Sequence, residues 1–130
     1  MSSVFSKIVS GQLPSHKVYE DSSTLAFLDI HPVQTGHCLV IPKKEVEFIW
    51  DLDDQTYQAV MTTVKKVGWR LRMVLAKPYV GIKVVGLDVP HAHVQLIPFS
   101  SASEFNASQD MNQETDQQML AQLAKKLYFH

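Results

Sequence analysis

Two histidines and a glutamine alternate with apolar residues in the segment spanning residues 89–98. His91, His93 and Gln95 have one parity, while Ala92 and Val94 have the other. A β-strand directs successive side chains to opposite faces, so this pattern predicts a half-buried strand. One face would pack on a core, and the other would present two imidazoles and an amide in a row.

The side chains in this row are compatible with three interpretations. An imidazole attacks a phosphorus or carbonyl centre well when its second ring nitrogen is held as a donor, and a neighbouring imidazole and amide could bind phosphate oxygens. Two neutral imidazoles could instead bind a metal ion, with His37 or Glu45 as further ligands. The third interpretation is a pair of surface histidines that carry no chemistry.

Length and composition favour one soluble domain over residues 1–130, with 45% hydrophobic and 19% charged residues. The formal net charge is −1, so the chain has no overall positive charge that would attract nucleic acid or a membrane surface. No apolar run approaches the roughly 20 residues that span a bilayer. The start lacks the pattern of a secretory signal, and Cys38 is the one cysteine, so we expect a cytoplasmic protein without an internal disulfide.

The remaining chain predicts the elements that must position the row. Residues 3–10 predict a short helix, and residues 17–20, 24–30, 37–41, 79–85 and 89–98 predict strands. A tight turn at residues 86–88 favours antiparallel pairing of the last two strands. Residues 100–112 predict a loop, and residues 113–128 a final helix.

The strongest helical pattern follows Asp51 and Asp53, either of which can cap it. Its apolar residues recur at spacings of three and four, and Pro78 prevents its continuation. These apolar residues are Tyr57, Val60, Met61, Val64, Val67, Leu71, Val74 and Leu75. We therefore predict an α+β fold with an about five-stranded, mainly antiparallel sheet, one long helix on one face and short terminal helices.

Residues 90–98 closely resemble the signature of the histidine triad (HIT) superfamily, in which three histidines alternate with apolar residues. Gln95 stands at the third triad position. Residues 5–9, 13–14, 18–21, 26–30 and 36–43 resemble the amino-terminal half of the same family in the right order. The resemblance covers about residues 5–98, and residues 99–130, a polar loop and a C-terminal helix, are not diagnostic.

The resemblance implies a HIT-like fold that binds a purine nucleotide or nucleotide conjugate and reacts at the α-phosphate through a nucleotidyl-histidine intermediate. His93 matches the nucleophile, His91 the first triad member that shapes the site, and His37 a histidine that supports the triad. Asp29 matches the acid that accepts hydrogen bonds from the ribose hydroxyls. The positions that match the base pocket are Phe5, Ile8, Phe27, Leu28, Ile30 and Leu39.

Gln95 departs from the triad pattern. A His-x-His-x-Gln pattern resembles that of nucleotidyl transferases and diadenosine polyphosphate phosphorylases within the superfamily. An amide donates a hydrogen bond but no titratable proton, so a general-acid contribution of typically 10²–10⁴-fold would be lost or supplied elsewhere. We therefore expect a nucleotide hydrolase or nucleotidyl transferase acting on phosphoramidates, adenylates or dinucleoside polyphosphates. The alternative is a nucleotide-binding module with weak or no catalysis.

A second departure concerns metal. Many bacterial members bind structural zinc through two cysteines near the start, a histidine after the Pro-Lys segment and a histidine near the triad. Ser3, Ser6 and Glu45 stand at the first three of these positions, so we expect neither zinc nor another cofactor. Family members of this size are often homodimers that join their sheets, and we expect the same here, without nucleic acid or membrane as partners.

Overall fold

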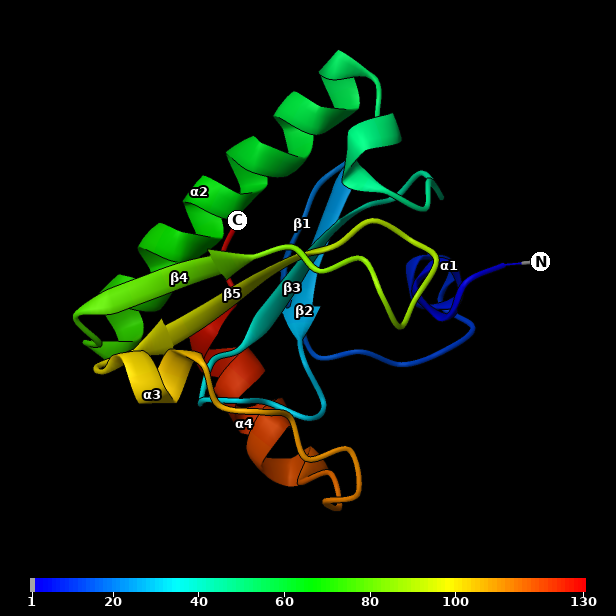
Figure 1. The fold of residues 1–130 in the computed structure, drawn as a ribbon. Coiled ribbons are helices and arrows are strands. Elements are labelled where there is room, and N and C mark those ends of the chain that lie inside the picture. Colours follow the sequence, from blue (N-terminus) through cyan, green and yellow to red (C-terminus); the bar gives the residue numbers. More distant parts are fainter. Residues whose placement is uncertain (1) are drawn as a thin grey trace.

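The computed structural model describes residues 2–130, and its centre is one five-stranded antiparallel sheet in the order β1-β2-β3-β5-β4 (Figure 1). The fold class predicted from the sequence is therefore confirmed. The strands are β1 (Lys17–Glu20), β2 (Thr24–Leu28), β3 (Cys38–Pro42), β4 (Tyr79–Lys83) and β5 (Val94–Phe99). The helices are α1 (Val4–Ser10), the 3-10 helix η1 (Ile49–Asp51), α2 (Asp54–Leu75), α3 (Ala102–Phe105) and α4 (Gln117–Leu127).

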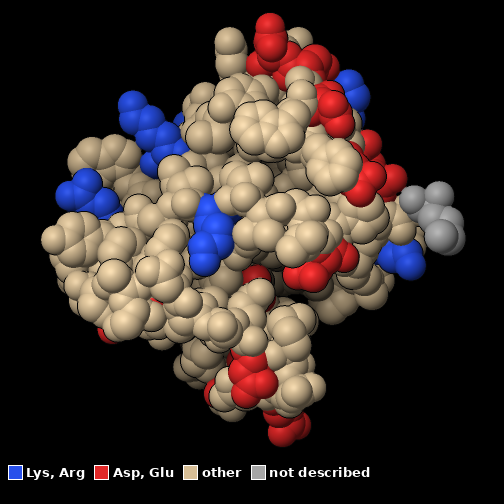
Figure 2. Space-filling model, in the orientation of Figure 1, with Lys and Arg blue, Asp and Glu red and all other residues tan. Residues whose placement is uncertain are grey.

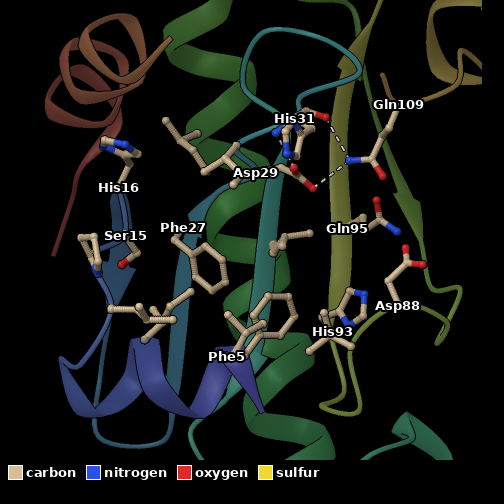
Figure 3. A pocket seen from close by; sticks show the side chains of 18 of the residues that line it. Phe5, Ser15, His16, Phe27, Asp29, His31, Asp88, His93, Gln95 and Gln109 are labelled. Atoms are coloured by element: carbon tan, nitrogen blue, oxygen red, sulfur yellow. Dashed lines mark hydrogen bonds between the residues drawn. The ribbon is translucent and has the colours of Figure 1, made fainter. Parts of the chain in front are cut away.

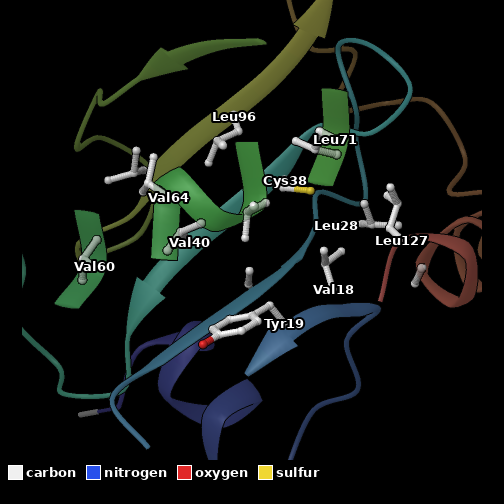
Figure 4. Close-up of a cluster of buried hydrophobic side chains, with 14 of the residues drawn as sticks. Val18, Tyr19, Leu28, Cys38, Val40, Val60, Val64, Leu71, Leu96 and Leu127 are labelled. Carbon is white, nitrogen blue, oxygen red and sulfur yellow. The ribbon is translucent and has the colours of Figure 1, made fainter. Parts of the chain in front are cut away.

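Helix α2 crosses one face of the sheet and closes the larger core (Figure 4). Asp53 caps it, with a carboxylate oxygen that accepts from the Thr56 N–H at 2.7 Å. The predicted apolar face is largely confirmed, because Val60, Val64, Val67 and Leu71 are buried, whereas Tyr57 is 42% exposed. The helix ends at Ala76, which has a left-handed φ of 53°, two residues before Pro78.

Helix α1 lies over the opposite face of the sheet. The Ser3 hydroxyl caps it by accepting from the Ser6 N–H, and Gly11 ends it with a φ of 86°. A second core cluster forms beneath this helix, made of Phe5, Leu25, Phe27, Leu39 and Ile41. Strands β2 and β3 therefore bury side chains on both faces; in β3, Leu39 and Ile41 lie on the α1 side and Cys38 and Val40 on the α2 side.

The prediction of a continuous strand over residues 89–98 was wrong for its first half. Strand β5 begins at Val94, so both histidines precede it. The backbone there bonds outside the sheet: the His91 N–H donates to the Val89 carbonyl at 2.8 Å, and the Ala92 N–H to the Val46 carbonyl at 2.7 Å. Pro90 has no main-chain N–H that could donate a hydrogen bond to a neighbouring strand. Strand β4 ends at Lys83, so a much longer connection than residues 86–88 joins it to β5.

The carboxy-terminal part departs most from the predicted elements. A short helix, α3, interrupts the predicted loop, and its Phe105 ring packs so closely over Gly81 that a Cβ there would collide with it. Helix α4 is shorter than predicted because Asp116 caps it at Gln117. The Phe129 N–H then donates to the Val18 carbonyl and ties the chain end to β1. Among residues 2–130, no helix is both long and apolar enough to cross a membrane.

Candidate active site

A pocket of about 460 Å³ lies on the sheet face that α1 covers, with His93 and Gln95 on one side and Asp29 on the other (Figure 3). Its walls come from α1, the segment that leads into β1, β2, β3, the segment before β5 and the segment after α3. The side chains that line it are mostly apolar, with a few convergent polar groups, as in small-molecule sites.

His93 is held in one tautomer. Its Nδ1–H donates to the main-chain carbonyl of His91 at 2.8 Å, because a carbonyl can only accept. The neutral ring therefore keeps its Nε2 lone pair free. The Phe5 ring meets the imidazole edge to face at 5.2 Å between centroids and fixes its plane. In this tautomer the Nε2 lone pair is available on a ring that borders the pocket, which is what a nucleophilic imidazole needs.

The Gln95 amide is oriented by His37. The His37 Nε2–H donates to Gln95 Oε1 at 2.9 Å, while its Nδ1 accepts from the Val33 N–H at 3.1 Å. Burial lowers the pKa of His37 and outweighs the opposing effect of Asp29, whose Oδ2 lies 3.7 Å from Nε2. With its oxygen occupied, Gln95 presents its NH₂ group to the pocket as a hydrogen-bond donor beside His93 (Figure 3).

His91 is fully buried and does not border the pocket. Its Nε2–H donates to the Pro42 carbonyl at 2.7 Å, and its Nδ1 accepts from the Ser3 hydroxyl at 2.9 Å. Burial lowers the pKa of His91, although the Pro42 carbonyl and Glu45 oppose that effect. Both ring nitrogens are therefore engaged by the protein, so His91 acts on the pocket through His93.

Asp29 presents a carboxylate to the far end of the pocket. Its Oδ1 accepts from the His31 N–H at 2.8 Å, and its Oδ2 accepts from the side-chain amide of Gln109 at 3.1 Å. Gln109 also donates to the His31 carbonyl at 2.9 Å, so it ties the segment after α3 across the pocket. Figure 3 shows these two bonds joining Gln109 to the Asp29 turn.

The predicted base-pocket residues separate into two groups. Five of them line the pocket and point to the α1 side of the sheet or its rim: Phe5, Ile8, Phe27, Ile30 and Leu39. Leu28 borders the same pocket, but its side chain is buried in the core under α2. His37, the predicted support of the triad, does not border the pocket and lies behind Gln95, to which it is hydrogen-bonded.

Several pocket residues had no signal in the sequence. Asp88 belongs to the connection before β5, and His16 and Gln117 meet in a hydrogen bond of 2.6 Å at the opposite rim. Gln109 and Met111 come from a segment that the sequence predicts only as a polar loop. No local pattern marks these residues, because long-range folding alone brings them to the pocket.

The residues at the zinc positions of bacterial relatives meet around His91 but do not fit that metal. Ser3 and Ser6 supply hydroxyls where zinc prefers thiolates or imidazoles, and their polar atoms bond to one another, to Glu45 and to His91. Among residues 2–130, no three side chains of His, Cys, Asp or Glu form a group that could hold a metal ion.

Comparison with known proteins places the chain in a family. The HIT domain model matches residues 10–102. A HIT-like protein of Borreliella burgdorferi is 40% identical over 102 residues, covering 73% of each chain. Adenosine 5'-monophosphoramidase HNT1 of Saccharomyces cerevisiae is 31% identical over 128 residues, covering 95% of this chain and 79% of its own.

A solved structure agrees with these matches. The crystal structure of a Hit-like protein involved in cell-cycle regulation from Bartonella henselae, with an unknown ligand, superposes with a TM-score of 0.85. It is 29% identical in sequence, and the match covers 97% of this chain and 93% of the other. By its sequence match, its sheet and its arrangement of helices, this chain belongs to the HIT family.

Proposed function

We propose that this protein hydrolyses or transfers nucleotides at the α-phosphate, with His93 as the nucleophile. The observation that carries the proposal is the bond from His93 Nδ1–H to the His91 carbonyl, which gives the neutral ring a free lone pair at Nε2, with His93 on the pocket wall. The pocket then has an apolar region suited to a base and a carboxylate, Asp29, suited to ribose hydroxyls.

The reaction has two displacements. His93 Nε2 forms a bond to the α-phosphorus while the bond from phosphorus to the leaving group breaks, which gives a nucleotidyl-histidine. Water or another acceptor then attacks the same phosphorus and loses its proton to solvent, while the bond from phosphorus to Nε2 breaks, which restores the imidazole and releases the nucleotide. The NH₂ group of Gln95 donates to a phosphate oxygen in both steps, so the site contributes through positioning and charge stabilisation.

A phosphoramidate is the substrate class that we favour. The relative from S. cerevisiae is named for adenosine 5'-monophosphoramide, and its similarity extends over 95% of this chain. Gln95 has no titratable proton, so the amine must take its proton from water or from another group as the P–N bond breaks. A carboxylate on the same pocket wall, Asp88, suits an amine better than a polyphosphate as leaving group.

Turnover of an adenosine phosphoramidate tests this proposal. We expect wild-type protein to release adenosine monophosphate, and His93→Ala to lose at least about 10³-fold in kcat, because removal of a covalent nucleophile abolishes the path through the intermediate. Acid-quenched wild type should carry a nucleotidyl adduct on His93 in a mass spectrum. Equal rates for wild type and His93→Ala would refute the proposal.

The second candidate is a binding module, and Gln95 is the observation that favours it. In that case calorimetry would show nucleotide binding without turnover or adduct. Gln95→His separates the two functions, since a rate gain of about 10²-fold or more would show that the wild-type site lacks only its general acid. The His37 contact can be kept in this variant because the new imidazole can accept from His37 Nε2–H.

We also propose a homodimer that joins two sheets through β4. Among the described residues β4 pairs only with β5, so its other edge is open. The surface beside it is apolar, and Figure 2 shows few charged side chains over the centre of this face. Tyr79 and Ile82 on β4 and Val84, Val85 and Leu87 just after it are exposed apolar residues, and exposed Trp69 of α2 lines the same hollow as Ile82.

A second copy meeting β4 across a two-fold axis would satisfy the open strand edge and cover this surface. Sedimentation at micromolar concentration should give twice the mass of one chain, and Ile82→Lys should give a folded monomer. A wild-type monomer under these conditions would exclude the dimer.

A further inference from the structure

Four side chains outside the pocket lining meet behind the nucleophile: Ser3, Ser6, Glu45 and His91. We call this group the serine–glutamate clamp. Glu45 Oε1 accepts from the Ser3 main-chain N–H at 2.6 Å and from the Ser6 hydroxyl at 2.7 Å. The Ser3 hydroxyl accepts from the Ser6 N–H and donates to His91 Nδ1, both at 2.9 Å. The Glu45 carboxylate thus ties the start of α1 to the segment after β3, and the Ser3 hydroxyl ties it to His91 in the segment before β5.

The bonds from Ser3 and Ser6 lower the pKa of Glu45 to about 2, although its side chain is open to solvent. The carboxylate is therefore ionised at any pH near neutrality. An ionised acceptor forms stronger hydrogen bonds than a neutral one, so the geometry of the two serines is held most firmly in this charge state.

The clamp reaches His93 in two steps. Ser3 on one side and the Pro42 carbonyl on the other hold the His91 ring in place. The main-chain carbonyl of His91 then accepts the Nδ1–H of His93 at 2.8 Å and fixes its tautomer. Because Pro90 and the bonds of His91 and Ala92 keep this segment out of the sheet, strand pairing does not hold that carbonyl in place.

We propose that Glu45 is a positioning residue, which holds the His91 carbonyl, and through it the His93 tautomer, by way of Ser3 and Ser6. In this chain the hydrogen-bonded clamp takes the place that structural zinc has, by resemblance, in bacterial family members. The effect on catalysis rests on the proposed function of His93, whereas the effect on the tautomer does not.

Glu45→Ala, Glu45→Gln and Glu47→Ala test the proposal together. Glutamine keeps an oxygen that accepts from both serines, and Glu47→Ala removes an exposed carboxylate two residues away as a matched control. For turnover of an adenosine phosphoramidate, Glu45→Ala should lower kcat roughly 10- to 100-fold with KM nearly unchanged, as for lost support of an active-site ligand. Glu45→Gln should stay within about threefold of wild type, and Glu47→Ala should equal it.

Nitrogen NMR of the histidine rings gives a readout that does not need turnover. Wild type and Glu45→Gln should show His93 protonated only at Nδ1, while Glu45→Ala should show a mixture of both tautomers. An unchanged His93 tautomer and unchanged kcat in folded Glu45→Ala would overturn the proposal. If no protein turns over substrate but the tautomer still shifts, the proposed function fails and the positioning role stands.

A metal measurement completes the test. Wild-type protein dialysed against zinc should retain much less than one equivalent, because Ser3 and Ser6 offer no thiolate. If wild type retained one equivalent of zinc and Ser3→Ala did not, the proposal that the clamp takes the place of zinc would be wrong.

Discussion

The two faces of the central sheet are built from the same strands but differ in what covers them. On the α2 face, a 22-residue helix closes the core over Ala26, Leu28, Cys38 and Val40. On the other face, the seven-residue helix α1 covers only part of the cluster around Phe5 and Phe27, and the pocket opens beside it. Residues of β2 and β3 are therefore equally buried on both faces, but those on the α2 face form the core whereas some of those on the α1 face line the pocket.

The difference separates stability from binding. The α2 face is mostly apolar, with one buried hydrogen bond between Thr24 and Thr63, so its residues contribute mainly to the free energy of unfolding. The α1 face carries the polar groups of the site, and buried histidines hold two of them: His37 bonds to Gln95, and the His91 carbonyl bonds to His93. Variants on the two faces should therefore change different measurements.

The largest effect on stability should come from the α2 face. Leu71→Ala removes a fully buried side chain and should lower the free energy of unfolding by about 2–5 kcal/mol. Nucleotide affinity at 25 °C should stay within about twofold, because Leu71 lies across the sheet from the pocket. Urea unfolding and calorimetry check this, and a matching loss of affinity would show that the two faces are coupled.

Asp29→Ala should have the opposite pattern, with a smaller effect that falls on nucleotide affinity and not on stability. The carboxylate should accept from ribose, and its loss should weaken nucleotide binding by about 1.5–3 kcal/mol, the usual range for hydrogen bonds to charged groups. Asp29→Asn is the control, since its amide oxygen still accepts from the His31 N–H and keeps the turn. Tight binding by Asp29→Ala would remove Asp29 from the ribose site.

The two faces should also set opposite pH limits of stability. Burial lowers the pKa of His37 and His91 below their usual 6.5, so their contribution is full above pH 6.5 and is lost as the pH falls through their lowered values. Burial raises the pKa of the Cys38 thiol above 9.0, so stability declines as the pH rises past 9 and the unfolded thiol ionises.

Thermal melts across pH check both limits. Cys38→Ala should flatten the decline above pH 9 and leave the decline below pH 6.5 unchanged. An acid limit that begins only below about pH 5, in the range of ordinary carboxyl groups, would show that the two histidines do not set it.

The smallest effect should come from the rim of the pocket. Ile30 is 47% exposed, so Ile30→Ala should change the free energy of unfolding by less than about 0.5 kcal/mol. Affinity for a purine nucleotide should fall roughly threefold through lost apolar contact. A loss of stability similar to that of Leu71→Ala would mean that Ile30 belongs to the core.

Patterns of period two and period 3.6 were sufficient to predict the sheet and α2. The strand predicted over residues 37–41 is present, and its neighbouring residues Cys38 and Leu39 belong to the two different cores on opposite faces of the sheet. The same alternation failed at His91, where Pro90 and the Val46 carbonyl take the backbone out of the sheet. The resemblance named His93 and Asp29, but Gln109 and Asp88 depend on contacts between distant segments that no local pattern encodes.

The bond from Gln109 to Asp29 has a consequence for selectivity between ribose and deoxyribose. In the free protein the Asp29 Oδ2 already accepts from the Gln109 amide. A carboxylate oxygen can accept a second hydrogen bond, so a ribose hydroxyl can bind to Oδ2 while Gln109 stays in place. A sugar that lacks this hydroxyl leaves the Gln109 bond intact and loses only its own hydrogen bond to Asp29, so the carboxylate favours ribose over deoxyribose without any rearrangement of the pocket.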